Sequence, residues 1–197
     1  MLTKLNLELA TLQKLKKLTG TNRHEFFGYT LDLDKSIITD NLPQLMGNLN
    51  EWSTQIFTTL LCHYSLANPI AQTGTLVKYK DIHGGYAYEN AFIKRAIEPI
   101  AEVFGEKPKE LLKAANLLGG TKLALGDASF EILALKGITL TYILWGKEDF
   151  PASANILYDA SASSYLPTED LAVLGELSTL RLIEASKTIF SNLSRHL

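Results

Sequence analysis

The chain has 197 residues, of which 46% are hydrophobic and 20% are charged, and its formal net charge is −2. This size and composition suit a globular domain with a substantial core, and the near-neutral charge without a basic stripe argues against a nucleic-acid partner. The single cysteine, Cys62, excludes an internal disulfide and a thiolate-only metal or iron–sulfur site within one chain.

The sequence offers no internal boundary and no membrane segment. No linker rich in proline, glycine and serine divides it, so residues 1–197 are expected to form a single domain. Lys4 and Glu8 bring charge into the N-terminus early, unlike a signal peptide. The longest uncharged run, Trp52–Val77, could span a bilayer by length, but polar residues and Pro69 interrupt it. We therefore expect a cytoplasmic protein without a membrane partner.

The first part of the chain predicts a helix, a β-hairpin and a second helix. Leucines spaced three and four apart predict an amphipathic helix over residues 1–20, which either packs on the core or docks a partner or second copy. Alternating apolar residues over 25–39, with a turn at Asp32–Lys35, predict a hairpin. Residues 41–50 are predicted to be a loop, and Trp52–Ala67 a helix.

The middle of the chain predicts a short strand, 75–80, followed by a glycine pair that enters a helix. Gly84–Gly85 either exposes backbone N–H groups to a phosphate or carboxylate ligand, or simply makes a tight strand-to-helix turn. Helices are predicted over 86–104, with a kink at Pro99, and over 110–118.

The remainder of the chain alternates short strands and turns before a final helix. Turns this short predict an antiparallel meander. The predicted strands are 121–125, 129–135, 138–145 and 155–158, and the helix is 168–191. The expected fold class is therefore α+β: an antiparallel sheet, made of the N-terminal hairpin and the C-terminal meander, packed with about five helices.

Acidic residues gather in and around the stretch from Trp145 to Asp170. Three or more carboxylates together would suit Mg²⁺ or Ca²⁺, and a pair would suit general acid–base catalysis. The spacing matches neither an EF-hand nor a zinc-binding helix, and the same acids suit turns and a helix start. No metal and no cofactor is therefore assigned.

Aromatic residues accompany the glycines and acids in the same motifs. If these regions converge, they form a pocket with aromatic walls and few polar groups, as small-molecule sites usually have. His83 would be its only histidine, as a ligand to a metal or cofactor, a general base or a surface residue; His24, His63 and His196 show no partner. The candidate ligand-binding residues are His83, Gly84, Gly85, Tyr86, Glu89, Asp127, Trp145, Glu148, Asp149, Phe150, Asp159, Tyr165 and Glu169.

Three blocks carry a resemblance to known proteins: Lys78–Tyr86 with Ala91–Phe92, Leu118–Gly120 with Gly126–Ala128, and Leu144–Leu174. Together, over residues 25–185, the chain resembles an uncharacterised prokaryotic family, found mainly in anaerobes, that carries only a domain-of-unknown-function label. Some of its members carry a four-cysteine iron–sulfur segment. The resemblance implies anaerobic redox or corrinoid metabolism and an iron–sulfur or corrinoid protein as partner. This chain, with only Cys62, departs from those members.

Three functions are compatible with these observations. The lack of a recognised catalytic motif favours a non-enzymatic module that binds a small molecule or cofactor or acts as an accessory protein. A carboxylate-dependent enzyme, with or without Mg²⁺, would need Asp127, Glu148 and Asp159 to converge in a cleft. A protein–protein adaptor, or an oligomer, would use the leucine-rich terminal helices and expose an apolar patch there.

Overall fold

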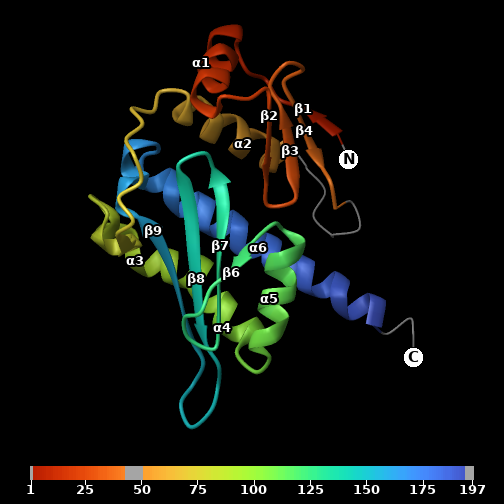
Figure 1. Cartoon of the computed structure of the whole chain (residues 1–197), viewed down its shortest axis with the longest axis vertical. Helices are drawn as coiled ribbons and strands as arrows, with labels where there is room; N and C mark the ends of the chain where they lie inside the picture. The colour runs from red at the N-terminus through yellow and green to blue at the C-terminus, as the bar shows by residue number, and fades with distance from the viewer. Residues whose placement is uncertain (1, 43–50, 194–197) are drawn as a thin grey trace.

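The structure is a computed structural model that describes residues 2–42 and 51–193 (Figure 1). It contains two antiparallel sheets together with helices, which confirms the α+β class. The N-terminal hairpin and the C-terminal meander form separate sheets rather than one. The loop predicted at 41–50 lies largely outside the described residues.

The N-terminal sheet has four strands in the order β1-β4-β3-β2. They are β1 (Leu2–Lys4), β2 (Arg23–Phe26), β3 (Tyr29–Asp32) and β4 (Ile37–Asp40). The predicted hairpin is β3 and β4. The sequence analysis missed a second turn, because Phe27 and Gly28 connect β2 to β3 with φ values of 48° and 74°. Two consecutive positive φ angles give the tight turn that matches strand twist, although phenylalanine is rarely found in it.

The helix predicted for residues 1–20 is shorter than expected. Helix α1 spans Leu9–Thr19, and Leu2 instead pairs with Thr39 in the sheet. The leucine spacing alone could not reveal this, because an edge strand of three residues is too short to show an alternating pattern. Gly20 ends α1 in the left-handed conformation, and its N–H donates to Lys16 O.

The C-terminal sheet has the order β5-β9-β8-β7-β6, with every neighbouring pair antiparallel. The predicted meander is confirmed, and the short strand predicted at 75–80 becomes an edge strand beside β9. The strands are β5 (Leu76–Lys78), β6 (Thr121–Lys122), β7 (Ala128–Leu135), β8 (Ile138–Trp145) and β9 (Ser153–Asp159).

Helices cover the sheets, and the longest, α6 (Thr168–Leu193), crosses behind the C-terminal sheet in Figure 1. The others are α2 (Glu51–Tyr64), α3 (Gly85–Phe92), α4 (Glu98–Phe104) and α5 (Pro108–Leu117). A π-helical segment, Ile93–Ile97, joins α3 to α4 just before Pro99, which has no N–H to continue the α-helical pattern. No helix in the described ranges is long and apolar enough to cross a membrane.

Two buried tyrosines fasten α6 to the C-terminal sheet. Tyr142 of β8 places its hydroxyl against Ser178 and Thr179, and Tyr158 of β9 donates to Leu171 O at 2.8 Å. Burial raises the pKa of Tyr142 to about 12, so this hydroxyl keeps its proton. The polar groups of the core are thus used to fix the helix on the sheet.

A buried ion pair fastens the same helix to the N-terminal sheet. Arg181 and Asp40 contact each other with side chains only 2% and 1% exposed. The Arg181 Nε also donates to Phe27 O at 3.2 Å, and its guanidinium lies 4.3 Å from the centre of the Tyr29 ring. One side chain on α6 therefore holds the β2–β3 turn and the end of β4.

We predict that Asp40→Asn lowers the free energy of unfolding by about 3–5 kcal/mol, because it removes the buried counter-charge of Arg181 and leaves only the more exposed Glu184, 3.4 Å away, to pair with the guanidinium. Urea denaturation followed by circular dichroism measures this. The exposed pair of Lys16 and Asp34 is the matched control, and Asp34→Asn should change stability little. Equal effects of the two substitutions would contradict the role given to Arg181.

A second prediction concerns His24, which is 7% exposed on β2. Burial lowers the pKa of His24, although a hydrogen bond with the Ala134 backbone acts in the opposite direction. The unfolded chain therefore takes up the proton first, and stability should fall as the pH drops below about 6.5. The urea midpoint should decrease between about pH 7.5 and 5, and His24→Phe should flatten that decrease. If the urea midpoints of the wild type and of His24→Phe changed identically with pH, the role given to His24 would be contradicted.

Candidate functional site

The predicted site residues fall into two groups at opposite ends of β9. Trp145 pairs with Ser153 at the first end, whereas Asp159 lies at the other end of this seven-residue strand, about 20 Å away. The first end holds Asp127, Trp145, Glu148, Asp149 and Phe150, and the residues toward the second are His83, Gly84, Gly85, Tyr86, Asp159, Tyr165 and Glu169. Glu89 lines a hollow beside Ala154, Asn155 and Ile156 of β9. The structure does not bring the two groups into one pocket.

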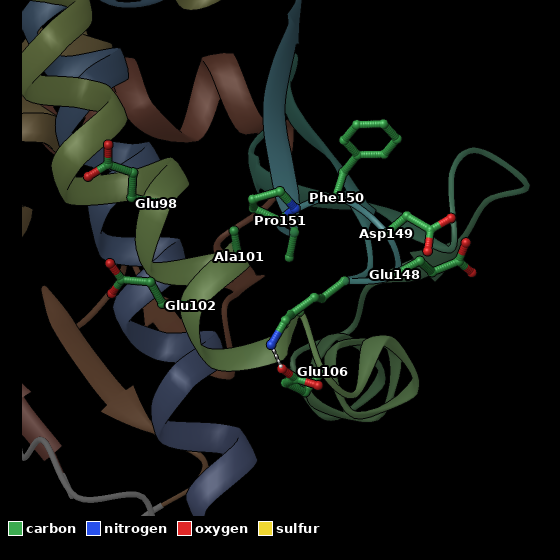
Figure 2. Close-up of a pocket in the computed structure, with 11 residues that line it drawn as sticks. Glu98, Ala101, Glu102, Glu106, Glu148, Asp149, Phe150 and Pro151 are labelled. Carbon is green, nitrogen blue, oxygen red and sulfur yellow. Dashed lines mark hydrogen bonds and ion pairs between the residues drawn. The ribbon is translucent and has the colours of Figure 1, made fainter.

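At the first end, a groove of about 570 Å³ lies between α4 and the β8–β9 loop, residues 146–152 (Figure 2). Ala101 of α4 and Pro151 and Ala152 of the loop give it an apolar floor. Five carboxylates line it, and Lys147 is the one cation among its lining residues. The acids are Glu98, Glu102 and Glu106 on the helix side and Glu148 and Asp149 on the loop side.

Hydrogen bonds hold the loop against the end of α4 and against the turn before β7. The Lys147 N–H donates to Gly105 O at 2.9 Å, and the Gly146 N–H donates to the Asp127 carboxylate at 2.7 Å. A Cβ at Gly105 would overlap Ala152, so helix and loop touch at this point. The groove therefore exists before any ligand arrives, which lowers the entropic cost of binding.

The carboxylates spread around the groove rather than converge. In Figure 2, Glu98 and Glu102 lie at the left along α4, and Glu148 and Asp149 extend from the loop at the right. In the described ranges, no three Asp, Glu, His or Cys side chains are placed to hold a metal ion. The arrangement is thus a broad acidic surface.

Aromatic side chains add apolar area beside these acids. Phe150 is 81% exposed at the edge of the groove, and Trp145 is 40% exposed where β8 ends. Lys147 is already paired with Glu106 at 2.7 Å, the dashed line in Figure 2, and this bond raises the pKa of Lys147. The negative charge of the other carboxylates is left for a ligand.

At the second end, packing explains the glycine pair before α3. Gly84 has φ of 82°, and the Gly85 N–H donates to Ile82 O at 2.8 Å. A Cβ at Gly85 would overlap the carbonyl oxygen of Tyr79. The N–H of Gly85 is therefore occupied within the chain, and the tight-turn interpretation accounts for this residue.

The neighbouring candidates are dispersed over the surface. His83 is exposed, and its carbonyl accepts a hydrogen bond from the Thr168 hydroxyl at 2.7 Å. Tyr86 is 80% exposed, and Glu89 lies 3.6 Å from Lys80 in an ion pair. These side chains do not form a pocket with His83.

Asp159 is an anchor for the chain before β5. Its two carboxylate oxygens accept the N–H groups of Thr73 at 3.0 Å and Gly74 at 2.7 Å. Burial alone would raise the pKa of Asp159, but hydrogen bonds with Ser161, Thr73 and Gly74 hold it well below its usual range. This carboxylate therefore stays ionised and occupied, unlike a catalytic acid.

The remaining two candidates at this end, Tyr165 and Glu169, do not share a pocket with His83 or Asp159 either. The Tyr165 hydroxyl donates to Ile70 O at 2.7 Å. Glu169 lines a separate hollow of about 190 Å³ between α3 and α6, together with Tyr88 and Arg95.

The sequence analysis missed a contact between His63 of α2 and Asp170 of α6. Their Nδ1 and Oδ2 atoms lie 2.6 Å apart. In the sequence, Asp170 was one of the acids considered for a metal, for acid–base catalysis or for a helix start, and His63 appeared without a partner. No local signal could have joined them, because 107 residues separate the two.

The sequence of residues 20–181 matches the model of one protein family, described as Domain of unknown function (DUF3786). This match spans most of the 197 residues, so the chain belongs to that family, as the resemblance to an uncharacterised family indicated. No curated protein and no solved structure matches the chain significantly.

The two glycines before α3 give a prediction. Gly85→Ala should destabilise the fold by more than about 3 kcal/mol, because the new methyl group collides with a backbone carbonyl. Gly84→Ala should cost only about 1–2 kcal/mol, the strain of a left-handed alanine. Urea denaturation of both variants measures the difference. A larger loss for Gly84→Ala would contradict the packing explanation.

Proposed function

We propose that this member of a family without an assigned function is a non-enzymatic accessory protein, and that it binds a cationic segment of a partner. The binding surface is the groove between α4 and the β8–β9 loop. The observation that carries the proposal is the preformed, acid-lined groove with Phe150 exposed at its edge.

The openness of the groove favours a partner chain over a small molecule. All five of its carboxylates, and Phe150 and Pro151 as well, are exposed to solvent. Small-molecule sites are lined mainly by apolar side chains, whereas six of the eleven residues that line this groove are charged. An extended peptide or a surface helix that carries the opposite charge needs only such an open groove.

The charges specify the chemistry of the partner. Lys147 is neutralised by Glu106, so Glu98, Glu102 and the two loop acids face solvent without a cation from the groove. Their combined field attracts lysine and arginine side chains and speeds association. Phe150 offers a ring for apolar or cation–π contact with the same segment.

The other two functions considered from the sequence receive less support. Asp127 and Glu148 lie at the opposite end of β9 from Asp159, so the cleft required by a carboxylate-dependent enzyme is not formed by these acids. For an adaptor built on the terminal helices, most of the apolar face of α6 is already used, because Leu171 and Leu182 are fully buried. Leu9 on α1 and Leu180 on α6 are exposed.

The biological setting in this proposal rests on the sequence resemblance. The resemblance implies prokaryotes, mainly anaerobes, as the setting and an iron–sulfur or corrinoid protein as the partner, and the proposed cytoplasmic location is a separate expectation from the sequence. A basic segment on such a protein would supply the charges that the groove lacks.

A model peptide tests the charge requirement directly. A fluorescein-labelled peptide of alternating lysine and leucine should bind the full chain by fluorescence polarisation, and a glutamate–leucine peptide should not. The double variant Glu148→Gln/Asp149→Asn should raise the dissociation constant by about tenfold, since it removes two charges worth up to about 0.7 kcal/mol each. Added salt should weaken the wild-type complex.

The matched control is Asp81→Asn/Glu131→Gln, which removes two exposed acids outside the groove. This control should bind the peptide like the wild type. If both double variants weaken binding equally, the peptide recognises net charge only, and the groove is not the binding surface.

A further inference from the structure

A second candidate site lies at the other end of the molecule, where α2 meets the start of α6. Asp170 is nearly buried, with a side chain 12% exposed, while the His63 ring beside it is 45% exposed. A buried carboxylate thus holds a half-exposed imidazole. This pair shares no residue with the acidic groove of α4.

The pair fixes the protonation pattern of the ring. An ionised carboxylate can only accept, so the hydrogen of the His63–Asp170 contact sits on Nδ1. In the neutral ring, Nε2 therefore carries the free lone pair. No hydrogen bond within the described part of the chain engages Nε2. Histidines that bind ligands or metals through Nε2 are commonly oriented by a carboxylate in this way.

Two hollows flank the pair. His63 lines one of about 490 Å³, whose walls include Leu66, Ile70, Tyr165 and Leu166. Asp170 lines the other, of about 370 Å³, with Ile56, Leu60 and Val173 of α2 and α6. Each is within the size range of small-molecule sites. The hollow beside His63 mixes its apolar side chains with the polar ones of Asn68, Ser163, Ser164 and Tyr165.

The charges around the pair decide which ligands fit. Neither hollow includes a lysine or arginine among its lining residues, and Asp170 is the one acid in them. An anion would lose its hydration without gaining a counter-charge. The loss of hydration is less costly for a neutral or cationic molecule. An O–H or N–H group on such a molecule can donate a hydrogen bond to Nε2.

We propose that the hollow beside His63 binds a small neutral or cationic molecule, which donates an O–H or N–H hydrogen bond to Nε2 and lays an apolar body against Leu66, Ile70 and Leu166. Asp170 is the positioning residue: it accepts the Nδ1 hydrogen, so that in the neutral ring the lone pair lies on Nε2. This site does not depend on the acidic groove, and each can fail without the other.

Nuclear magnetic resonance tests both parts. In the full chain at about pH 8, a long-range proton–nitrogen spectrum should show the His63 hydrogen on Nδ1, the minor form of free imidazole. Phenol, a neutral donor at that pH, should shift the Nε2 signal on titration. Benzoate, of similar size but anionic, should not.

Variants separate binding from structure. His63→Gln should raise the dissociation constant for phenol by about tenfold, the loss expected for one hydrogen bond and its ring contacts. His83→Gln is the matched control, because His83 is exposed on the loop before α3, and it should bind phenol normally. Asp170→Asn should let the hydrogen move to Nε2 and weaken binding.

Three results would overturn the proposal. They are a hydrogen found on Nε2 in the wild type, a phenol titration that leaves the His63 signals unmoved, and benzoate binding as well as phenol. The first needs no variant, so the test holds even if a substitution at the α2–α6 contact prevents folding.

Discussion

The arrangement of this fold depends on the contacts of one guanidinium group, which is buried between a helix and a sheet. Arg181 extends from α6 to Asp40, to the Phe27 carbonyl and to the Tyr29 ring. Earlier turns of the same helix receive the hydroxyls of Tyr142 and Tyr158 from the other sheet. Because buried charges and hydroxyls must find partners, these contacts leave α6 few alternative positions.

The position of α6 determines where chemistry can occur. Its first turn brings Asp170 to His63 on α2, between two hollows. The acidic groove lies at the opposite end of the C-terminal sheet, where the β8–β9 loop rests on the end of α4. The core thus supports two separate surfaces, an open acidic one and a more apolar one with a histidine.

Sequence periodicity was sufficient for most elements, because the meander and the long helices have repeating apolar patterns and recognisable turns. It failed at the β2–β3 turn, where Phe27 adopts a positive φ that its side chain disfavours. It also failed at β1, whose three residues are stabilised only by pairing with β4. Both features depend on tertiary contacts.

The candidate sites show the same limit. The loop residues from Trp145 to Phe150 were singled out by their composition, but the acids of α4 that complete the groove are distant in sequence. The two motif regions, which would form one pocket only if they converged, lie at opposite ends of β9. The His63–Asp170 pair was invisible for the same reason. Local patterns identify unusual residues, while the packing of helices decides which of them meet.

Hydrogen–deuterium exchange of the full chain, with and without the lysine–leucine peptide, tests the central claim most directly, because it locates the bound segment without any substitution. The account predicts slower exchange in residues 98–106 and in the loop 146–152, with little change around His63. Protection that appears elsewhere, or nowhere, while the peptide is bound would contradict the assignment of the acidic groove as the partner surface.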